Sequence, residues 1–261
     1  MTLYNQDCLV GLKTIKDSTV DLVITDPPYK IISGGSTQLG IGDPTGIFNR
    51  KFTQSNASDA SDVRSGKLFK HNDITFNQWL PEVYRVLKNG THCYIMVNDR
   101  NLATLITQAE AVGFKLVNVL IWKKNNVTPN KWYMKSCEFI VMLRKGKAKN
   151  INNMGSNQCI EVKNPMGNKL HPTQKPVELI DVLLLNSSVP NELVLDPFMG
   201  SGSVAVSAIK NNRQYLGYEL DEKYFKIAQD QINNIQLTLL WQTTTTYRPA
   251  WAGRRLKTQW P

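Results

Sequence analysis

Residues 20–29 read VDLVITDPPY, a short apolar run that leads straight into a rigid acidic turn. The run Val20–Thr25 is rich in β-branched residues, which is typical of a strand buried in a parallel sheet. Asp26 and the two prolines after it end that strand. Ligands of open α/β sheets bind at the carboxyl ends of the strands. The sequence therefore predicts a ligand site directly after this strand.

The rest of the chain alternates helices and strands around this stretch. Apolar residues at helical spacing predict helices, and short apolar runs predict the strands between them. The predicted helices are 76–87, 102–112, 177–185, 204–211 and 223–235, and the further predicted strands are 91–97, 116–122, 139–143, 193–195 and 214–218. Such alternation indicates an α/β fold, a mostly parallel twisted sheet with helices on both faces.

The tetrapeptide Asp26-Pro27-Pro28-Tyr29 can form a rigid array of hydrogen-bond acceptors. The prolines fix φ and remove two backbone donors. The Asp26 carboxylate and the Pro27 carbonyl could each accept one hydrogen of an exocyclic amino group, and Tyr29 offers a face on which a planar base could stack. Asp-Pro-Pro is equally a good structural turn after a strand, and the tetrapeptide alone does not distinguish the two.

A second strand and turn stand at residues 194–203, VLDPFMGSGS. This stretch contains neither GxGxxG of a dinucleotide site nor GK[ST] of a Walker A loop. Gly200 and Gly202 would let a ligand approach the backbone at the start of the next helix. Glu219 follows a predicted strand, where a carboxylate can accept hydrogen bonds from both ribose hydroxyls. The combination favours a nucleoside ligand without phosphate, although a plain strand–helix turn with a surface glutamate has the same pattern.

Three motifs in chain order, DPPY, HPTQKP at His171–Pro176 and DPFMGSG, resemble those of the β-class amino-group DNA methyltransferases. These enzymes transfer a methyl group from S-adenosylmethionine to adenine N6 or cytosine N4. The resemblance covers about residues 4–235 and includes NQDCLVGL, WLPEVYRVLKNGTHCYIMV, IWKKNN and FIVMLRKGK. It implies a Rossmann-like methyltransferase fold. The catalytic tetrapeptide precedes the glycine loop, and this circular permutation marks the β class.

The resemblance also implies roles for individual residues. Asp26, Pro27, Pro28 and Tyr29 would bind the target amino group and stack on its base. The implied cofactor-binding residues are Asp7, Cys8, Asp26, His171, Thr173, Gln174, Lys175, Asp196, Phe198, Gly200, Ser201, Gly202 and Glu219. Asp7 and Cys8 would lie near the adenine of the cofactor and Glu219 at its ribose, with most of the others at the methionine end. A histidine such as His171 is more often structural, and only its place in HPTQKP supports the assignment.

The implied reaction is methylation of adenine N6, because Asp at the first tetrapeptide position is commoner in adenine enzymes and Ser in cytosine enzymes. Cytosine N4 methylation is the alternative. A third reading is a catalytically silent nucleic-acid-binding partner of the same fold, against which the intact motifs argue. The target nucleotide would be flipped out of duplex DNA. Direct in-line attack on the methyl group would need neither a metal nor a covalent enzyme intermediate.

The formal net charge of +10 on 261 residues suggests a polyanionic partner. Residues 123–150 hold eight basic residues and one acid, and residues 237–261 hold four basic residues and no acid. Basic side chains after a strand's carboxyl end are suited to contact phosphates. The predicted DNA contacts are Lys123, Lys124 and Lys131. The lysines after residue 144 fit a solvated charged face equally well.

We expect one catalytic domain, residues 1–236, in which polar segments at 30–68 and 145–168 are candidates for target recognition. The second segment is short, which leaves open a compact site or a homodimer that shares recognition. The basic tail, residues 237–261, contains four consecutive threonines and three tryptophans. Its composition is compatible with a β extension, a nucleic-acid arm or sequence of non-native origin.

Membrane and metal partners are not expected. No stretch approaches 18 uninterrupted apolar residues, and the N-terminus has no charged leader followed by an apolar run. The four cysteines are scattered without a CxxC pair, which predicts free thiols in a reducing cytoplasm and no zinc site.

Overall fold

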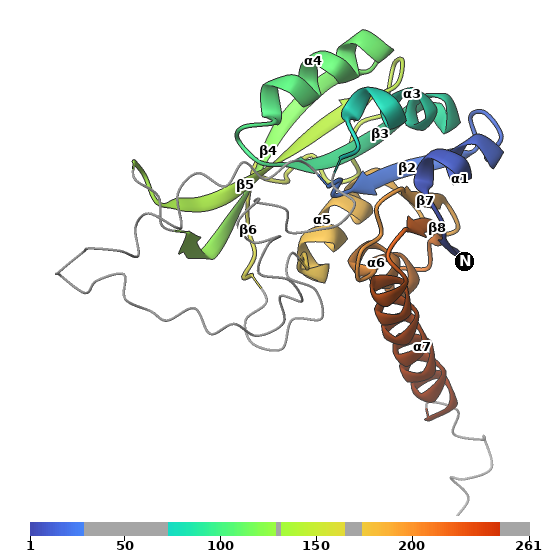
Figure 1. Cartoon of the computed structure of the whole chain (residues 1–261). Coiled ribbons are helices and arrows are strands. Elements are labelled where there is room, and N and C mark those ends of the chain that lie inside the picture. Colours follow the sequence, from blue (N-terminus) through green and yellow to red (C-terminus); the bar gives the residue numbers. More distant parts are fainter. Residues whose placement is uncertain (29–72, 129–131, 165–173, 246–261) are drawn as a thin grey trace, which may run out of the picture.

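The computed structural model describes residues 1–28, 73–128, 132–164 and 174–245 (Figure 1). The predicted functional residues outside these ranges are Tyr29, Lys131, His171 and Thr173. The whole candidate recognition segment 30–68 lies outside them as well, as do the last four residues of the segment 145–168 and residues 246–261 of the tail.

Within the described residues, eight strands form one sheet in the order β1-β8-β7-β2-β3-β5-β4-β6. Their bounds are β1 Thr2–Asn5, β2 Val20–Thr25, β3 Leu87–Val97, β4 Lys115–Thr128, β5 Lys135–Arg144, β6 Cys159–Glu161, β7 Leu193–Asp196 and β8 Gln214–Glu219. Neighbouring strands run parallel except that β5 is antiparallel to both β3 and β4. The mostly parallel sheet is confirmed, with an antiparallel hairpin inside it.

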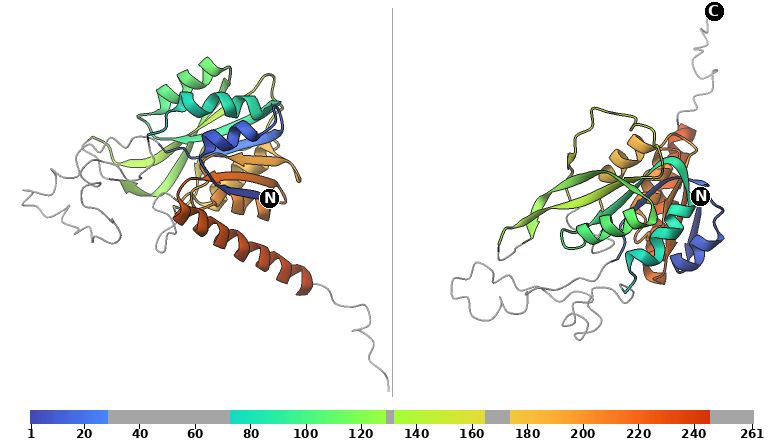
Figure 2. Two further views of the ribbon diagram at one scale, coloured as in Figure 1. Left: turned by 45° about the vertical axis from the view of Figure 1, so that its right-hand side comes forward. Right: turned by 90° about the horizontal axis from the view of Figure 1, so that it is seen from above.

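Helices cover both faces of this sheet, as predicted (Figures 1 and 2). One face carries α1 Cys8–Thr14, α3 Phe76–Val86 and α4 Leu102–Val112, and the other carries α5 Val177–Ser187, α6 Ser203–Lys210 and α7 Glu222–Thr245. Alternate residues of β2 explain the two layers: Val23 packs with the first set, and Leu22 and Ile24 pack with the second. All six residues of β2 are buried, because helices cover both sides of a central strand.

Three short elements among the described residues were not predicted: β1, α1 and β6. They span four, seven and three residues, too few for an apolar period to be visible. The last helix, α7, runs ten residues beyond its predicted end at Ile235 and crosses the expected domain boundary after residue 236. Leu237, Leu240 and Trp241 continue the helical apolar spacing past Ile235, so this pattern extended beyond the predicted end.

Strands β2 and β7 lie side by side although they are far apart in the sequence. Leu22 pairs with Val194 and Val23 with Leu195, in parallel register. From β2 the chain crosses to β3 on one side, and from β7 it crosses to β8 on the other. This divergence makes the carboxyl ends of β2 and β7 a topological switch point, the place where open α/β sheets bind ligands.

Candidate active site

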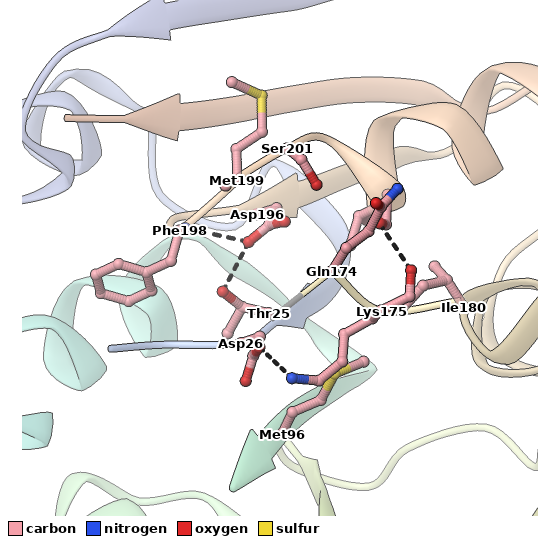
Figure 3. Close-up of a pocket in the computed structure, with 13 residues that line it drawn as sticks. Thr25, Asp26, Met96, Gln174, Lys175, Ile180, Asp196, Phe198, Met199 and Ser201 are labelled. Atoms are coloured by element: carbon pink, nitrogen blue, oxygen red, sulfur yellow. Dashed lines mark hydrogen bonds and ion pairs between the residues drawn. The ribbon is translucent and has the colours of Figure 1, made fainter. Parts of the chain in front are cut away.

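A pocket opens at this switch point (Figure 3). It is lined from β2, from β3, from the segment that precedes α5, and from the glycine loop between β7 and α6. The sequence-predicted residues that line it are Asp26, Gln174, Lys175, Asp196, Phe198, Gly200 and Ser201. Two motifs about 170 residues apart in the sequence, DPPY and DPFMGSG, therefore contribute to one cavity, as the resemblance implied.

Asp26 reaches this pocket from the end of β2. Its Oδ2 accepts a 2.5 Å hydrogen bond from Lys175 Nζ, and a quarter of its side chain (25%) remains exposed to an incoming ligand. Burial raises the pKa of Asp26, and the positive charge of Lys175 opposes that rise. Pro27 is buried and Pro28 half-buried. The turn therefore holds an acceptor group at the edge of the cavity.

Asp196 lies at the end of β7 and is almost fully buried. Its Oδ1 accepts a 2.7 Å hydrogen bond from Thr25 Oγ1 and a 3.1 Å hydrogen bond from the backbone N–H of Phe198. Burial raises the pKa of Asp196 to about 7, against these two hydrogen bonds and assisted by the charges of Asp26 and Glu219. A cation bound in this pocket would relieve the cost of ionising this carboxyl group.

The glycine loop takes a backbone conformation that L side chains rarely adopt. Gly200 has φ +54° and Gly202 has φ +89°. A Cβ at Gly202 would lie 3.1 Å from the Cβ of Ala228 on α7, whereas a Cβ at Gly200 would meet no described atom within 4 Å. The first glycine thus leaves room at the pocket, and the second lets the start of α6 pack closely against α7.

Glu219 closes the loop from the end of β8. Its Oε2 accepts the N–H of Gly200 and its Oε1 accepts the N–H of Asp221, both at 2.8 Å. A carboxylate oxygen can accept more than one hydrogen bond, so both oxygens can still accept from ribose hydroxyls. Burial raises the pKa of Glu219, and the backbone donors at Asp221 and Gly200 act against the rise.

Strand β1 brings the N-terminal candidates, Asp7 and Cys8, toward Glu219. Asn5 pairs with Glu219 across the β1–β8 ladder. Asp7 caps α1, because its Oδ1 accepts the N–H of Leu9 at 2.8 Å. Burial, and then the charge of Asp7, raises the pKa of the Cys8 thiol to about 12. Cys8 is therefore a protonated thiol in the hydrophobic core beside α1 and not a nucleophile.

The sequence interpretation missed Glu138, which lies on β5. Its carboxylate lies 3.0 Å from Lys124 Nζ and 3.4 Å from Lys175 Nζ. The sequence offers one signal for this residue, because Glu138 is the one acidic residue in the basic segment 123–150. Lys124, predicted to contact DNA, points into this cluster with a side chain only 10% exposed. Lys123 lies outside the cluster, half exposed and paired with Glu161 at 2.8 Å.

The last residues of the basic segment have structural partners. Lys145 Nζ donates to the backbone carbonyls of Tyr84 and Leu87, each at 2.7 Å, at the C-terminal end of α3. Lys149 pairs with Glu192 at 3.4 Å. Part of the positive charge that suggested a polyanionic partner is therefore used within the fold.

All four cysteines are unpaired, as predicted. In the described part of the chain, no group of three or more His, Cys, Asp or Glu side chains gathers as metal ligands would. None of the described helices combines the length and the apolar character that crossing a membrane requires.

The model of a protein family described as DNA methylase, N6_N4_Mtase, matches residues 20–230, most of the chain. This protein belongs to that family. The type II methyltransferase M.HinfI of Haemophilus influenzae is 27% identical over 258 residues, which cover 90% of this chain and 69% of the relative. M2.MboI of Moraxella bovis, also a type II methyltransferase, is 25% identical over 252 residues, covering 89% and 88%.

Solved structures share the fold of this DNA methylase. M1.HpyAVI in complex with S-adenosylmethionine superposes with a TM-score of 0.63 at 23% identity, covering 88% of this chain and 98% of that one. The cytosine-N4-specific PvuII DNA methyltransferase gives a TM-score of 0.64 at 16% identity, covering 92% of each chain. The Rossmann-like methyltransferase fold is thus confirmed.

The family depends on S-adenosylmethionine, and the pocket fits this molecule. Its sulfonium and ammonium groups are cationic, and Asp26, Asp196 and Glu219 bring three carboxyl groups to the site. The open backbone at Gly200 and the acceptor oxygens of Glu219 suit a nucleoside. The phosphate-free ligand expected from the glycine loop agrees with that cofactor.

Proposed function

We propose that this methyltransferase modifies the N6 amino group of adenine in duplex DNA, with the target nucleotide flipped out of the stack. The supporting observation is the Asp26 carboxylate, which stands at the switch-point pocket beside the glycine loop. Within this family, Asp at the first position of the tetrapeptide is commoner in the enzymes that methylate adenine. An amino group inside a base pair cannot reach a recessed pocket, so flipping is required.

The described contacts of Asp26 suit it to bind an amino group. Lys175 occupies Oδ2, and no described residue donates a hydrogen bond to Oδ1. Oδ1 and the Pro27 carbonyl could therefore accept the two hydrogens of the target NH₂. Two such acceptors draw the nitrogen toward tetrahedral geometry and localise its lone pair for direct in-line attack. S-adenosylmethionine, when bound, supplies the activated methyl group.

The cofactor assignments follow the same geometry. We assign the ribose to Glu219, the neighbourhood of the adenine to Asp7 and Cys8, and the cationic methionine end to Asp196. The glycine loop supplies close backbone approach through Phe198, Gly200 and Ser201, and Gln174 lines the same cavity. Gly202 supports this loop by letting α6 pack closely against α7. For Lys175, the contact with Asp26 favours a role at the target base in place of the cofactor's methionine end.

We assign the contacts with DNA phosphates to lysine side chains of the basic segment 123–150. Lys123 at β4 is half exposed and suited to such a contact. Lys131, which lies outside the described residues, is kept as a phosphate contact on its sequence position alone. The inward-pointing Lys124 is better placed to act on the site than on the DNA backbone. We place the enzyme in the cytoplasm. Whether one copy or a homodimer binds the DNA is a separate question, which the measured mass of the protein–DNA complex will decide.

A nucleoside digest tests the choice of base. Unmethylated genomic DNA is incubated with the full chain and methyl-labelled S-adenosylmethionine, then digested and separated. We expect label in N6-methyladenine, and label confined to N4-methylcytosine would overturn the base assignment. A wild-type chain that binds DNA and transfers no methyl group would support the silent-partner reading.

The variant Asp26→Ala tests the catalytic assignment in the same assay. We expect its transfer rate to fall by about 100-fold or more, since an acceptor made for the reacting amino group is removed. The matched control is Asp230→Ala, which removes an exposed carboxylate on α7. Full activity in Asp26→Ala would contradict the mechanism.

A further inference from the structure

Four charged side chains of alternating sign form a chain that leads away from the pocket. Asp26 contacts Lys175 at 2.5 Å, Lys175 contacts Glu138 at 3.4 Å, and Glu138 contacts Lys124 at 3.0 Å. The four come from β2, the segment before α5, β5 and β4. We name this group the charge chain. It contains two carboxylates and two ammonium groups, so its formal charge is zero.

Burial makes each member of the charge chain dependent on its neighbours. The side chains of Lys175 and Lys124 are each 10% exposed. A buried ammonium group must be paired, and removing one partner leaves the other uncompensated. The main chain of Lys175 is held as well, because Ser203 Oγ donates to its carbonyl at 2.9 Å. Lys175 is thus fixed at both ends, against α6 and against two carboxylates.

We propose that Lys175 is a positioning residue for Asp26: its ammonium group orients the carboxylate at the pocket edge and keeps it in the acceptor form, while Glu138, held by Lys124, fixes that ammonium group. This inference rests on the function proposed above and adds three positioning roles to it. It also gives the inward-pointing Lys124 a task at the site.

The electrostatics of the site explain why a cation is needed there. Burial raises the pKa of Asp26, and a protonated carboxyl group would offer an O–H donor where the target NH₂ requires an acceptor. Glu138 adds to this rise, and Asp196 is the other described carboxyl group that interacts with Asp26. Among the described residues, Lys175 is the cation within ion-pair distance of Asp26, and it lowers the pKa of Asp26.

Glu138 stays ionised for a similar reason. Burial acts to raise the pKa of Glu138, but Lys175 and Lys124 outweigh burial and leave the pKa below its ordinary value. An ionised Glu138 is a second carboxylate that attracts the ammonium group of Lys175, 3.4 Å away. Two carboxylates thus hold the ammonium group of Lys175.

The test is the pH profile of methyl transfer by Lys175→Gln. Single-turnover rates are measured on unmethylated duplex DNA at saturating S-adenosylmethionine, from about pH 5.5 to about pH 9.5, with the full chain. Asp26 must be ionised to accept, so activity is lost on the acid side. Removing the cation should move this acid limb upward by about 1–3 pH units. Lys175→Arg, which keeps the charge, should leave the limb in place.

The matched control is Lys226→Gln, which removes an exposed lysine paired with Glu222 on α7 and should match the wild type. Thermal unfolding and the dissociation constant for S-adenosylmethionine are measured for each variant. A purely structural role, or a role at the methionine end of the cofactor, predicts a similar loss at every pH or weaker cofactor binding, with the limb unmoved. Either result would overturn the inference. If Lys175→Gln does not fold, an acid limb that Lys175→Arg moves upward would overturn it equally.

The proposed base and the proposed role of Lys175 can fail separately. The digest of DNA methylated by the wild type decides between adenine and cytosine. The comparison of acid limbs applies to whichever amino group is methylated, because both bases present an NH₂ to Asp26. A cytosine product with a moved limb would therefore reject the base and retain the positioning role.

Discussion

Thr25 Oγ1 donates a 2.7 Å hydrogen bond to Asp196 Oδ1 and so joins the ends of two strands that are 171 residues apart in the sequence. Thr25 ends β2, which leads into the catalytic turn, and Asp196 ends β7, which leads into the glycine loop. Both side chains are buried. The bond ties the two turns together, so the proposed sites of the target base and the cofactor lie on neighbouring strands of one sheet.

The stability of the ligand-free protein should fall as the pH rises through the pKa of Asp196. The folded-state pKa of about 7 lies above the ordinary value of 3.8, so the folded protein binds this proton more tightly than the unfolded chain. The stabilising effect is complete below about pH 4 and is lost by about pH 8. The total change is on the order of 4 kcal/mol at most. Urea unfolding at several pH values measures it.

The variant Asp196→Asn tests whether the carboxyl group of Asp196, and no other titrating group, causes this pH dependence of stability. Asn keeps an Oδ1 acceptor for Thr25 and for the N–H of Phe198, and it does not titrate. We expect its unfolding free energy to depend less on pH than that of the wild type, and to exceed the wild-type value at about pH 8. Equal pH dependence in the two proteins would show that the carboxyl group of Asp196 is not the titrating group.

The two glycines of the loop should respond differently to alanine. Gly202→Ala places a Cβ 3.1 Å from the Cβ of Ala228 at φ +89°, and we expect a loss of about 1–2 kcal/mol or more in unfolding free energy. Gly200→Ala is strained by its φ alone and should destabilise the fold less. Because Gly200 lines the pocket, its variant should weaken S-adenosylmethionine binding by roughly tenfold, or about 1.4 kcal/mol.

Isothermal titration and thermal unfolding of both glycine variants give the comparison. The prediction is a reversal of order, in which Gly202→Ala is the less stable protein and Gly200→Ala has the larger loss of affinity relative to its loss of stability. Identical effects in the two variants would mean that the space beside Gly200 is not used by the cofactor.

Glu138→Gln should slow methyl transfer without weakening cofactor binding. The change removes the second carboxylate that holds Lys175, and we expect the plateau rate to fall by about 10-fold to 100-fold, equal to about 1.4–2.7 kcal/mol. It also removes a negative neighbour of Asp26, so the acid limb should not move upward.

The matched control for this prediction is Glu161→Gln on β6, which removes the exposed partner of Lys123. That variant should retain the wild-type plateau rate. Single-turnover measurements at saturating DNA and cofactor compare the two. A plateau unchanged in Glu138→Gln, or equally reduced in Glu161→Gln, would contradict a specific role for Glu138.

Substitutions at two lysines of the basic segment should have different effects, one on the stability of the fold and the other on DNA binding. Lys145→Met removes the donor to the last carbonyls of α3 and should lower the unfolding free energy by about 1–2 kcal/mol. Its effect on the salt dependence of DNA binding should be nil. Lys123→Gln should leave stability nearly unchanged and reduce the slope of log affinity against log salt by about one. Fluorescence anisotropy at several salt concentrations measures that slope, and a reduced slope in Lys145→Met would reject the assignment.

Local sequence predicted most of the central elements. The apolar, β-branched run before Asp26 gave β2 with its correct bounds, and the helical spacing at residues 102–112 gave α4 likewise. These segments succeed because burial on a sheet or helix face imposes a short period on the sequence itself. The resemblance implied one site for DPPY and DPFMGSG, and the parallel pairing of β2 with β7 brings the two strands that precede these motifs side by side.

The charge chain lies beyond such a prediction. Glu138 and Lys124 belong to a segment whose composition favours DNA contact, and nothing local marks two of its members as inward-pointing. Their direction follows from the β4–β5 hairpin, whose antiparallel pairing places them beside Lys175. Lys145 shows the same effect, since only the packing of β5 near α3 turns a surface charge into a helix cap.

The sequence by itself determined the class of fold, the two turns and the chemistry that their residue types allow, because these depend on short-range patterns and on side-chain identity. Tertiary structure alone decided which charges meet. Lys175, Glu138 and Lys124 act on Asp26 only because strands and loops distant in the chain converge at one end of the sheet. A pairwise Coulomb interaction depends on distance in space and on burial, and a linear sequence contains neither.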